Sequence, residues 1–247
     1  MMRLALLGVV LLAGAAAPRS GYQDASPAIR SMQDDDAANP GFLWVQQGEA
    51  MWQDAGVASG RSCASCHGAA TAMRGVAARY PEFDPAAGHP VTLEQRINNC
   101  RTARQGEAAW KVESDELLAI TAFVGEQSRG LTVAVDTSGP ASPFAEKGKA
   151  LFTTRMGQLN LSCAQCHAER AGEHLAGALI PQGQPNGYPL YRLEWQSLGS
   201  LFRRIRSCLT GVRATPFEPN SADLVDLEFY LASRANGLAV ETPAVRP

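Results

Sequence analysis

The sequence predicts an all-α protein that contains two tandem copies of one unit. Two Cys-x-x-Cys-His motifs, beginning at Cys63 and Cys163, are the first sign of this duplication. The residues ahead of the motifs agree at the same spacing, with Gly48 corresponding to Gly148. Each copy then ends in an apolar segment with helical periodicity, at residues 117–124 and 224–231.

Composition indicates a folded globular protein. Hydrophobic residues make up 45% of the 247 residues and charged residues 19%, which excludes a disordered, fibrous or multi-span membrane protein. The formal net charge of −2 provides no overall attraction to nucleic acid, so no nucleic-acid partner is expected. The six cysteines and four histidines are the most informative residues, because their positions limit the possible chemistry.

The first twenty residues have the pattern of a secretory signal peptide. Met1-Met2-Arg3 is followed by an apolar run from Leu4 to Leu12 and then by small residues. We therefore expect residues 1–20 to be cleaved, between about Ala15 and Ser20, and the mature protein to work in the periplasm. A buried N-terminal helix is the alternative. The run is too short to span a bilayer, and no later apolar stretch is longer, so no membrane span is expected.

The rest of the chain divides into an arm, two domains and a linker. Residues 21–40 are predicted to form an N-terminal arm or, equally, a disordered solvated tail. Each copy of the repeat predicts a helix before the motif, a long stretch rich in Gly and Pro, and a final helix that crosses the first. We place domain 1 at residues 41–131, the linker at residues 132–144, and domain 2 with a C-terminal tail at residues 145–247.

The motif spacing predicts covalent haem. Six cysteines in an exported protein would by default form disulfides, but Cys-x-x-Cys-His is the sequence that attaches c-type haem. One turn of chain presents two thiols for thioether bonds and a histidine nitrogen for the iron. We therefore expect two c-type haems, each enclosed by one small cytochrome c-like domain, because the haem supplies core that about 90 residues could not build alone. Zinc sites or disulfides are the alternatives. The expected thioether residues are Cys63, Cys66, Cys163 and Cys166, and the expected proximal ligands are His67 and His167.

The second axial ligand of each iron is predicted to be a cysteine. No methionine follows His167, so the strong candidates in the second copy are His174 and Cys208. His174 lies only seven residues after the motif, which is little chain to reach the opposite face of the haem. Cys208 has a counterpart in the first copy, Cys100, whose competitors there are Met73 and His89. A disulfide between Cys100 and Cys208 is the alternative.

Arginine residues surround Cys208 in the sequence. Such cations favour a thiolate over a thiol, and guanidinium groups bind tetrahedral oxyanions through paired hydrogen bonds. This pattern predicts a nucleophilic sulfur beside an oxyanion site, and a solvated helix face is the alternative. The residues concerned are Arg203, Arg204, Arg206 and Arg213.

These features resemble the SoxA family, the dihaem subunits of SoxAX cytochromes in bacterial sulfur oxidation. The most specific part of the resemblance is residues 204–216, RIRSCLTGVRATP. The resemblance implies an L-cysteine S-thiosulfotransferase that joins thiosulfate oxidatively to a cysteine of the carrier protein SoxYZ, while electrons leave through a monohaem SoxX subunit. It further implies that Cys208 is the catalytic haem ligand and can carry a persulfide, that Arg204 binds substrate, and that Cys100 is the distal ligand of the first haem.

Two other functions are compatible with the residues. A thiosulfate dehydrogenase would join two thiosulfates to tetrathionate without a carrier protein. A non-enzymatic dihaem electron-transfer protein would use the cysteine ligands only to set its reduction potentials.

Overall fold

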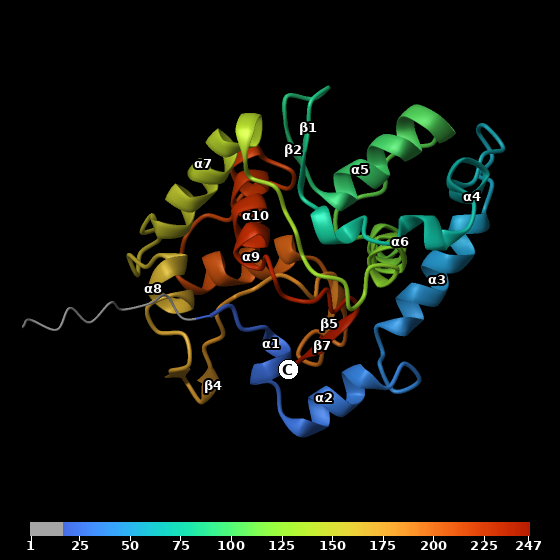
Figure 1. Cartoon of the computed structure of the whole chain (residues 1–247). Helices are drawn as coiled ribbons and strands as arrows, with labels where there is room; N and C mark the ends of the chain where they lie inside the picture. The colour runs from blue at the N-terminus through green and yellow to red at the C-terminus, as the bar shows by residue number, and fades with distance from the viewer. Residues whose placement is uncertain (1–16) are drawn as a thin grey trace, which may run out of the picture.

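The computed structural model describes residues 17–247, so most of the predicted signal peptide, residues 1–16, lies outside the described residues. The described chain is mainly helical, with two crossed helix pairs on opposite sides of the molecule (Figure 1). It also contains three small sheets, which the prediction of an all-α protein missed. Within residues 17–247, no helix is both long and apolar enough to cross a membrane.

The first helix pair consists of α3 (Phe42–Gln53) and α6 (Asp115–Glu126). Helix α6 begins after Ser114, whose side chain accepts a hydrogen bond from the Leu117 amide, as an N-cap residue does. Gly48 lies where α3 meets α6, and a Cβ atom there would overlap the backbone carbonyl of Ala119. The crossing therefore requires a residue without a side chain.

The second pair repeats this construction with α7 (Ser142–Thr153) and α10 (Ala222–Arg234). Gly148 occupies the position of Gly48, and a Cβ atom there would overlap the backbone carbonyl of Asp226. The glycine spacing in the sequence therefore corresponds to a repeated close contact between helices.

A hairpin followed by a helix is also present in both halves. Strands β1 and β2 pair antiparallel ahead of α5, and strands β5 and β6 pair antiparallel ahead of α9. The strands and helices correspond residue for residue when 108 is added to the number in the first half, for example 84 to 192 and 100 to 208. Their bounds are β1 Glu82–Asp84, β2 His89–Val91, α5 Leu93–Cys100, β5 Leu190–Arg192, β6 Ser197–Gly199 and α9 Leu201–Gly211.

Shorter elements complete the two halves. The motif helices are α4 (Cys63–His67) and α8 (Cys163–His167). The second half has an additional β3–β4 hairpin shortly after its motif. The remaining bounds are η1 Ala70–Met73, η2 Ala77–Arg79, the π-helix η3 Arg101–Gln105, β3 His174–Leu175, β4 Ala178–Leu179 and η4 Gly139–Ala141.

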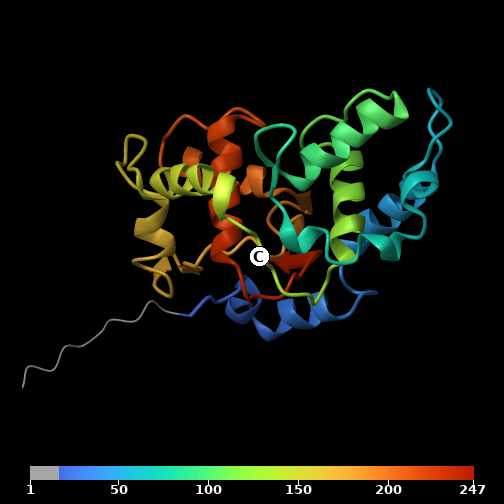
Figure 2. The same ribbon diagram turned by 45° about the horizontal axis from the view of Figure 1, so that its top comes forward.

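The N-terminal arm is packed and not a disordered tail. It forms α1 (Gly21–Asp24) and α2 (Pro27–Asp34), which lie against β7 (Ala244–Arg246) (Figure 2). The buried Gln33 side chain accepts hydrogen bonds from the Val245 amide at 3.0 Å and from Arg246 at 2.6 Å. Strand β7 in turn pairs parallel with β5.

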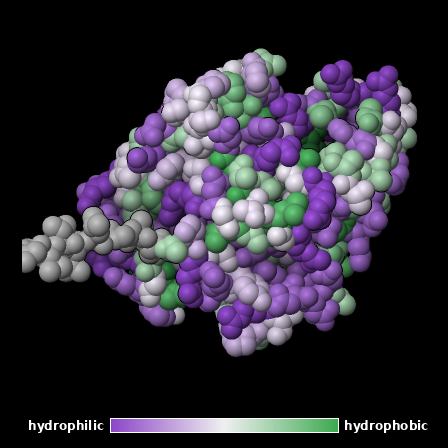
Figure 3. Space-filling model, viewed as in Figure 1, coloured by the Kyte–Doolittle hydropathy of each residue, from purple (hydrophilic) through white to green (hydrophobic). Residues whose placement is uncertain are grey.

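The two halves share their cores. Tyr191 and Leu198 of the second hairpin pack with Val245 against the helices of the first half. The predicted linker also packs against the second half, because Val133 and Val135 are buried beside Phe229 of α10. On the face seen in Figure 3, hydrophilic side chains predominate and hydrophobic ones lie in small groups among them.

Candidate haem-binding and catalytic site

Each Cys-x-x-Cys-His motif forms one short helix with a serine at its N-cap. Ser62 accepts a hydrogen bond from the Ser65 amide at 3.0 Å, and Ser162 accepts one from the Gln165 amide at 3.3 Å. A single helical turn places both cysteines and the histidine of each motif close together. Cys63 and Cys163 are half-buried and pack against the hydrophobic core of their own halves.

His167, a predicted iron ligand, is held by a hydrogen bond of the kind that orients metal-binding histidines. Its Nδ1 donates to the Pro181 carbonyl at 2.8 Å, which leaves Nε2 free to bind iron. Burial lowers the pKa of His167, and the nearby Arg204 and Arg234 lower it further. The ring is therefore neutral at neutral pH, as binding to iron requires.

His67 lies in a different environment. It is exposed, and its ring lies 5.8 Å from the ring of Trp52, measured between centroids. The indole of Trp52 donates to the Gly68 carbonyl at 3.1 Å and so connects α3 to the end of the first motif. The two histidines predicted to be proximal ligands thus have different supports in the two halves.

Cys100 and Cys208 each lie near the motif of their own half. Burial raises the pKa of the Cys163 thiol to about 11, and the neighbouring Cys208 contributes to this rise. Burial likewise raises the pKa of Cys63, with a contribution from Cys100. No disulfide joins any of the six cysteines, all of which are within the described residues, so the alternative Cys100–Cys208 disulfide is not formed.

The competing axial candidates lie in other places. His174 is exposed in the β3–β4 hairpin, and His89 lies in β2, which contacts α10 of the other half. Met73 packs against the same hydrophobic cluster as Cys63, so it is the competitor that stays near the first motif.

The arginines predicted to surround Cys208 point in different directions. Arg204 precedes Cys208 by one helical turn on the same face of α9, and its charge acts on His167. Arg203 is turned away, because its Nη1 donates to Ser197 Oγ at 3.0 Å and its guanidinium lies 4.4 Å from the centre of the Trp195 ring. Arg206 and Arg213 are exposed.

Sequence reasoning missed Tyr188 and Arg192, which also lie in this region. Burial raises the pKa of Tyr188 to about 12, while Arg204 and Arg192 act in the opposite direction. Cys208 is within electrostatic range of both residues. The signal that could have identified them is the repeated hairpin, whose strands are too short to stand out in the sequence.

The residues around the second motif fit a haem. The Nη1 of Arg234 is buried without a hydrogen-bond partner, and its Nη2 lies 3.5 Å from the His167 carbonyl oxygen. A buried guanidinium nitrogen in this position suits the carboxylate groups that a haem carries. Among residues 17–247, no group of three or more His, Cys, Asp or Glu side chains is arranged to hold a metal ion by itself.

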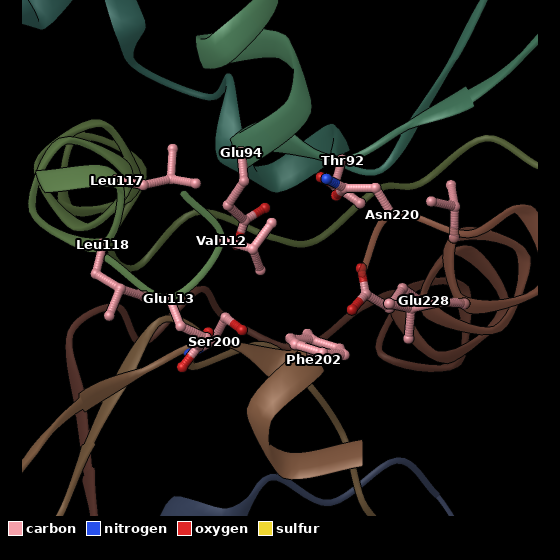
Figure 4. A pocket seen from close by; sticks show the side chains of 12 residues that line it. Thr92, Glu94, Val112, Glu113, Leu117, Leu118, Ser200, Phe202, Asn220 and Glu228 are labelled. Atoms are coloured by element: carbon pink, nitrogen blue, oxygen red, sulfur yellow. The ribbon is translucent and has the colours of Figure 1, made fainter. Parts of the chain in front are cut away.

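A small cavity of about 30 Å3 lies between the two halves, away from the motifs (Figure 4). Glu94 of α5 and Glu228 of α10 reach into it, and Glu113 accepts a hydrogen bond from the Ser200 amide at 3.2 Å. Burial raises the pKa of Glu228 well above its usual value, and Glu94 and Glu113 add to this effect. The cavity therefore favours the protonated form of the Glu228 carboxyl group.

Comparison with known proteins agrees with these features. The family model "SoxA/TsdA, cytochrome c domain" matches residues 47–133 and 147–240. The chain is 40% identical over 229 residues to the L-cysteine S-thiosulfotransferase subunit SoxA of Rhodovulum sulfidophilum, covering 92% of this chain and 80% of that protein. It is 39% identical over 227 residues to the subunit of the same name from Paracoccus pantotrophus, covering 92% and 78%.

A solved structure has the same fold. The crystal structure of SoxXA from P. pantotrophus aligns with a TM-score of 0.90 and 38% identity, covering 93% of this chain and 87% of that one. The similarity therefore extends over both halves and includes the hairpins and helices that surround Cys100 and Cys208.

Proposed function

The chain belongs to the SoxA family of cytochrome c proteins, and on this basis we propose that it is the catalytic subunit of an L-cysteine S-thiosulfotransferase in bacterial sulfur oxidation. The observation that carries this proposal is the 40% identity to a SoxA subunit over 92% of the chain. The placement of Arg204 and Cys208 on one face of α9 supports it. We propose the division predicted from the sequence, with an arm at residues 21–40, domains at residues 41–131 and 145–247, and a linker at residues 132–144.

We infer two covalently bound c-type haems, one in each cytochrome c-like domain. Thioether bonds form at Cys63 and Cys66 in the first domain and at Cys163 and Cys166 in the second. The axial ligands are His67 with Cys100 for the first iron and His167 with Cys208 for the second. The hydrogen bond from His167 to Pro181 and the unpartnered Arg234 nitrogen support the second site.

The proposed reaction joins thiosulfate to a thiol of a SoxYZ-type carrier protein. One carrier thiol and one thiosulfate give a carrier S-thiosulfonate, one proton and two electrons. When bound, the haems provide the route by which the two electrons leave. Arg204 binds the sulfonate oxygens through paired hydrogen bonds and so orients the terminal sulfur towards Cys208. In this proposal the Cys208 thiolate and thiosulfate together give up two electrons and form a Cys208–S–S–sulfonate intermediate. The carrier thiolate then attacks the sulfur next to the sulfonate group, which releases the Cys208 thiolate and gives the carrier S-thiosulfonate.

The partners and location follow from the same proposal. The similarity to the SoxXA structure supports a complex with a monohaem SoxX-type cytochrome. We place this complex in the periplasm, after cleavage of the predicted signal peptide.

Substitution of Cys208 tests the proposed role directly. The complex of holoprotein and cytochrome partner is mixed with thiosulfate, carrier protein and an electron acceptor. Cys208→Ala should abolish both acceptor reduction and the added mass on the carrier, because the nucleophile is lost. Arg204→Ala should mainly raise the KM for thiosulfate. Ser207→Ala is the matched control, since Ser207 is exposed beside Cys208 and should retain wild-type turnover.

Full activity of Cys208→Ala would contradict the proposal. Omission of the carrier separates the other two functions from it. Rapid tetrathionate formation without carrier would favour a thiosulfate dehydrogenase. Electron transfer with no sulfur product and no sulfur bound to Cys208 would favour a simple dihaem electron carrier.

A further inference from the structure

The repeated hairpin and helix allow the two halves to be compared residue by residue around the distal cysteines. An offset of 108 residues relates β1, β2 and α5 to β5, β6 and α9. It also relates Cys100 to Cys208 and Arg96 to Arg204, so each cysteine has an arginine one helical turn before it. The contacts of Arg96 in the first half can therefore be compared with the surroundings of Arg204 in the second.

In the first half, the arginine is neutralised by the hairpin. Arg96 donates from Nη2 to a carboxylate oxygen of Asp84 at 2.6 Å and from Nε to the Tyr80 hydroxyl at 3.2 Å. Asp84 is the last residue of β1, and Tyr80 lies just before that strand. Both charges of this pair are satisfied within the protein, so the arginine has little capacity for an external anion.

In the second half, the acidic partner is replaced by a base. The counterpart of Tyr80 is Tyr188, whereas the counterpart of Asp84 is Arg192, the last residue of β5. Among the described residues, no carboxylate forms an ion pair with Arg204. Burial lowers the pKa of Arg192, and the nearby Arg204 lowers it further, as expected for two adjacent cations.

Arg192 is only partly satisfied by its own contacts. Its Nε donates to the Pro247 carbonyl at 2.8 Å, and its Nη2 lies 3.2 Å from a carboxylate oxygen of Glu194. The Arg192 side chain is 15% exposed, whereas that of Glu194 is 64% exposed. A solvent-exposed carboxylate screens a half-buried guanidinium weakly. The Arg192 guanidinium carbon also lies 5.2 Å from the centre of the Trp195 ring. The charges of Arg204 and Cys208 both act on Arg192, so this region contains two guanidinium groups and one exposed carboxylate, that of Glu194.

We propose that Arg192 is a second anion-binding residue, which together with Arg204 holds the sulfonate end of thiosulfate beside Cys208. A divalent oxyanion with three oxygens can accept hydrogen bonds from two guanidinium groups at once. Arg192 is a specificity-determining residue because two cations favour a small dianion over a monoanion of similar size. The first half cannot bind such an anion, because Asp84 occupies the equivalent place. This inference rests on the proposed function, but anion binding can be measured without turnover.

The test compares thiosulfate binding and turnover in the complete cytochrome complex. Arg192→Gln removes the charge, and Arg192→Asp restores the acid–arginine pair of the first half. Isothermal titration with thiosulfate gives the Kd, and the carrier-dependent assay gives kcat and KM. Arg170→Gln is the control, because Arg170 is an exposed arginine paired only with Glu173.

Arg192→Gln should raise the Kd and KM for thiosulfate by about tenfold to a hundredfold, the loss expected for a charge-assisted hydrogen bond, with kcat little changed. Arg192→Asp should weaken binding further, because the new carboxylate pairs with Arg204. Arg170→Gln should bind as the wild type does. If Arg192→Asp does not fold, Arg192→Lys provides the test, and it should bind more weakly than wild type but more tightly than Arg192→Gln.

Thiosulfate binding that is unchanged in both Arg192→Gln and Arg192→Lys would overturn the inference. A loss of binding in these variants would support it even if the wild-type protein transferred no thiosulfate to a carrier. Failure of the transferase proposal and failure of the Arg192 assignment therefore give different results.

Discussion

The close approach of α7 to α10 at Gly148 gives a stability prediction whose size follows from the structure. In Gly148→Ala, the new Cβ would lie 2.7 Å from the Tyr230 Cβ, whereas ordinary contacts are 3.4–4 Å. It would also overlap the Asp226 carbonyl, which belongs to the backbone of α10 and cannot rotate away. Full relief requires the two helices to separate by about 1.4 Å, the difference between the 2.0 Å to the Asp226 carbonyl oxygen and 3.4 Å.

We expect a net loss of about 2 kcal/mol in the free energy of unfolding. Overpacking of this kind costs about 1–3 kcal/mol, and the rigid backbone partner places Gly148 at the upper end of that range. Alanine in a helix recovers up to about 1 kcal/mol relative to glycine. For a chain of this size, the unfolding midpoint should fall by about 4–8 °C.

Thermal unfolding of the holoprotein, followed by circular dichroism, measures this effect. Gly211→Ala is the matched control, because Gly211 ends α9 and a Cβ atom added there would have no neighbouring atom within 4 Å. The control should unfold at the wild-type temperature or slightly above it. If Gly148→Ala also unfolded there, the argument that the close helix contact requires glycine would be refuted.

Two further predictions concern Glu228 and Gln33. The stabilisation contributed by Glu228 should be fully present below the ordinary glutamate pKa and should be lost as pH rises through its raised pKa, by up to about 1.4 kcal/mol per pH unit, because the unfolded chain binds fewer protons. Glu228→Gln should reduce this loss in denaturant titrations from pH 5 to 9, and an unchanged slope would argue against a protonated Glu228. Gln33→Ala should cost about 1–3 kcal/mol in the same titrations, because it leaves the Val245 amide without an acceptor. The exposed Gln47→Ala should have no effect, and equal losses in the two variants would contradict the proposed role of Gln33.

The helical framework was predictable because its signals are local. The motifs, the apolar segments and the paired glycines all lie within short windows of sequence, and the structure confirms the helices that they predicted. The hairpins escaped prediction because three-residue strands show no clear alternation and because β2 contains Pro90, which normally argues against a strand. The roles of the cysteines and of Arg204 remain predictions.

The candidate site was predictable in part. Because Arg203 and Arg204 are adjacent in the sequence, both were predicted to lie beside Cys208. Successive residues on a helix point in different directions, however, and of these two only Arg204 shares a face with Cys208. Arg192 lies in a separate strand, and only the correspondence between the two hairpins relates it to Asp84, the residue that pairs with Arg96. The packed arm was equally hidden, since Gln33 and Val245 are 212 residues apart in the sequence.

The contact between α2 and β7 has a consequence for the order in which the protein is completed. The ribosome makes α2 long before β7. The arm therefore cannot form its contacts with β7 until both halves have been synthesised. During this interval, Ile29 and Met32, which end in the core of the first half, have no strand β7 to cover them. The arm can therefore complete its contacts only after the last strand of the chain, β7, has been made.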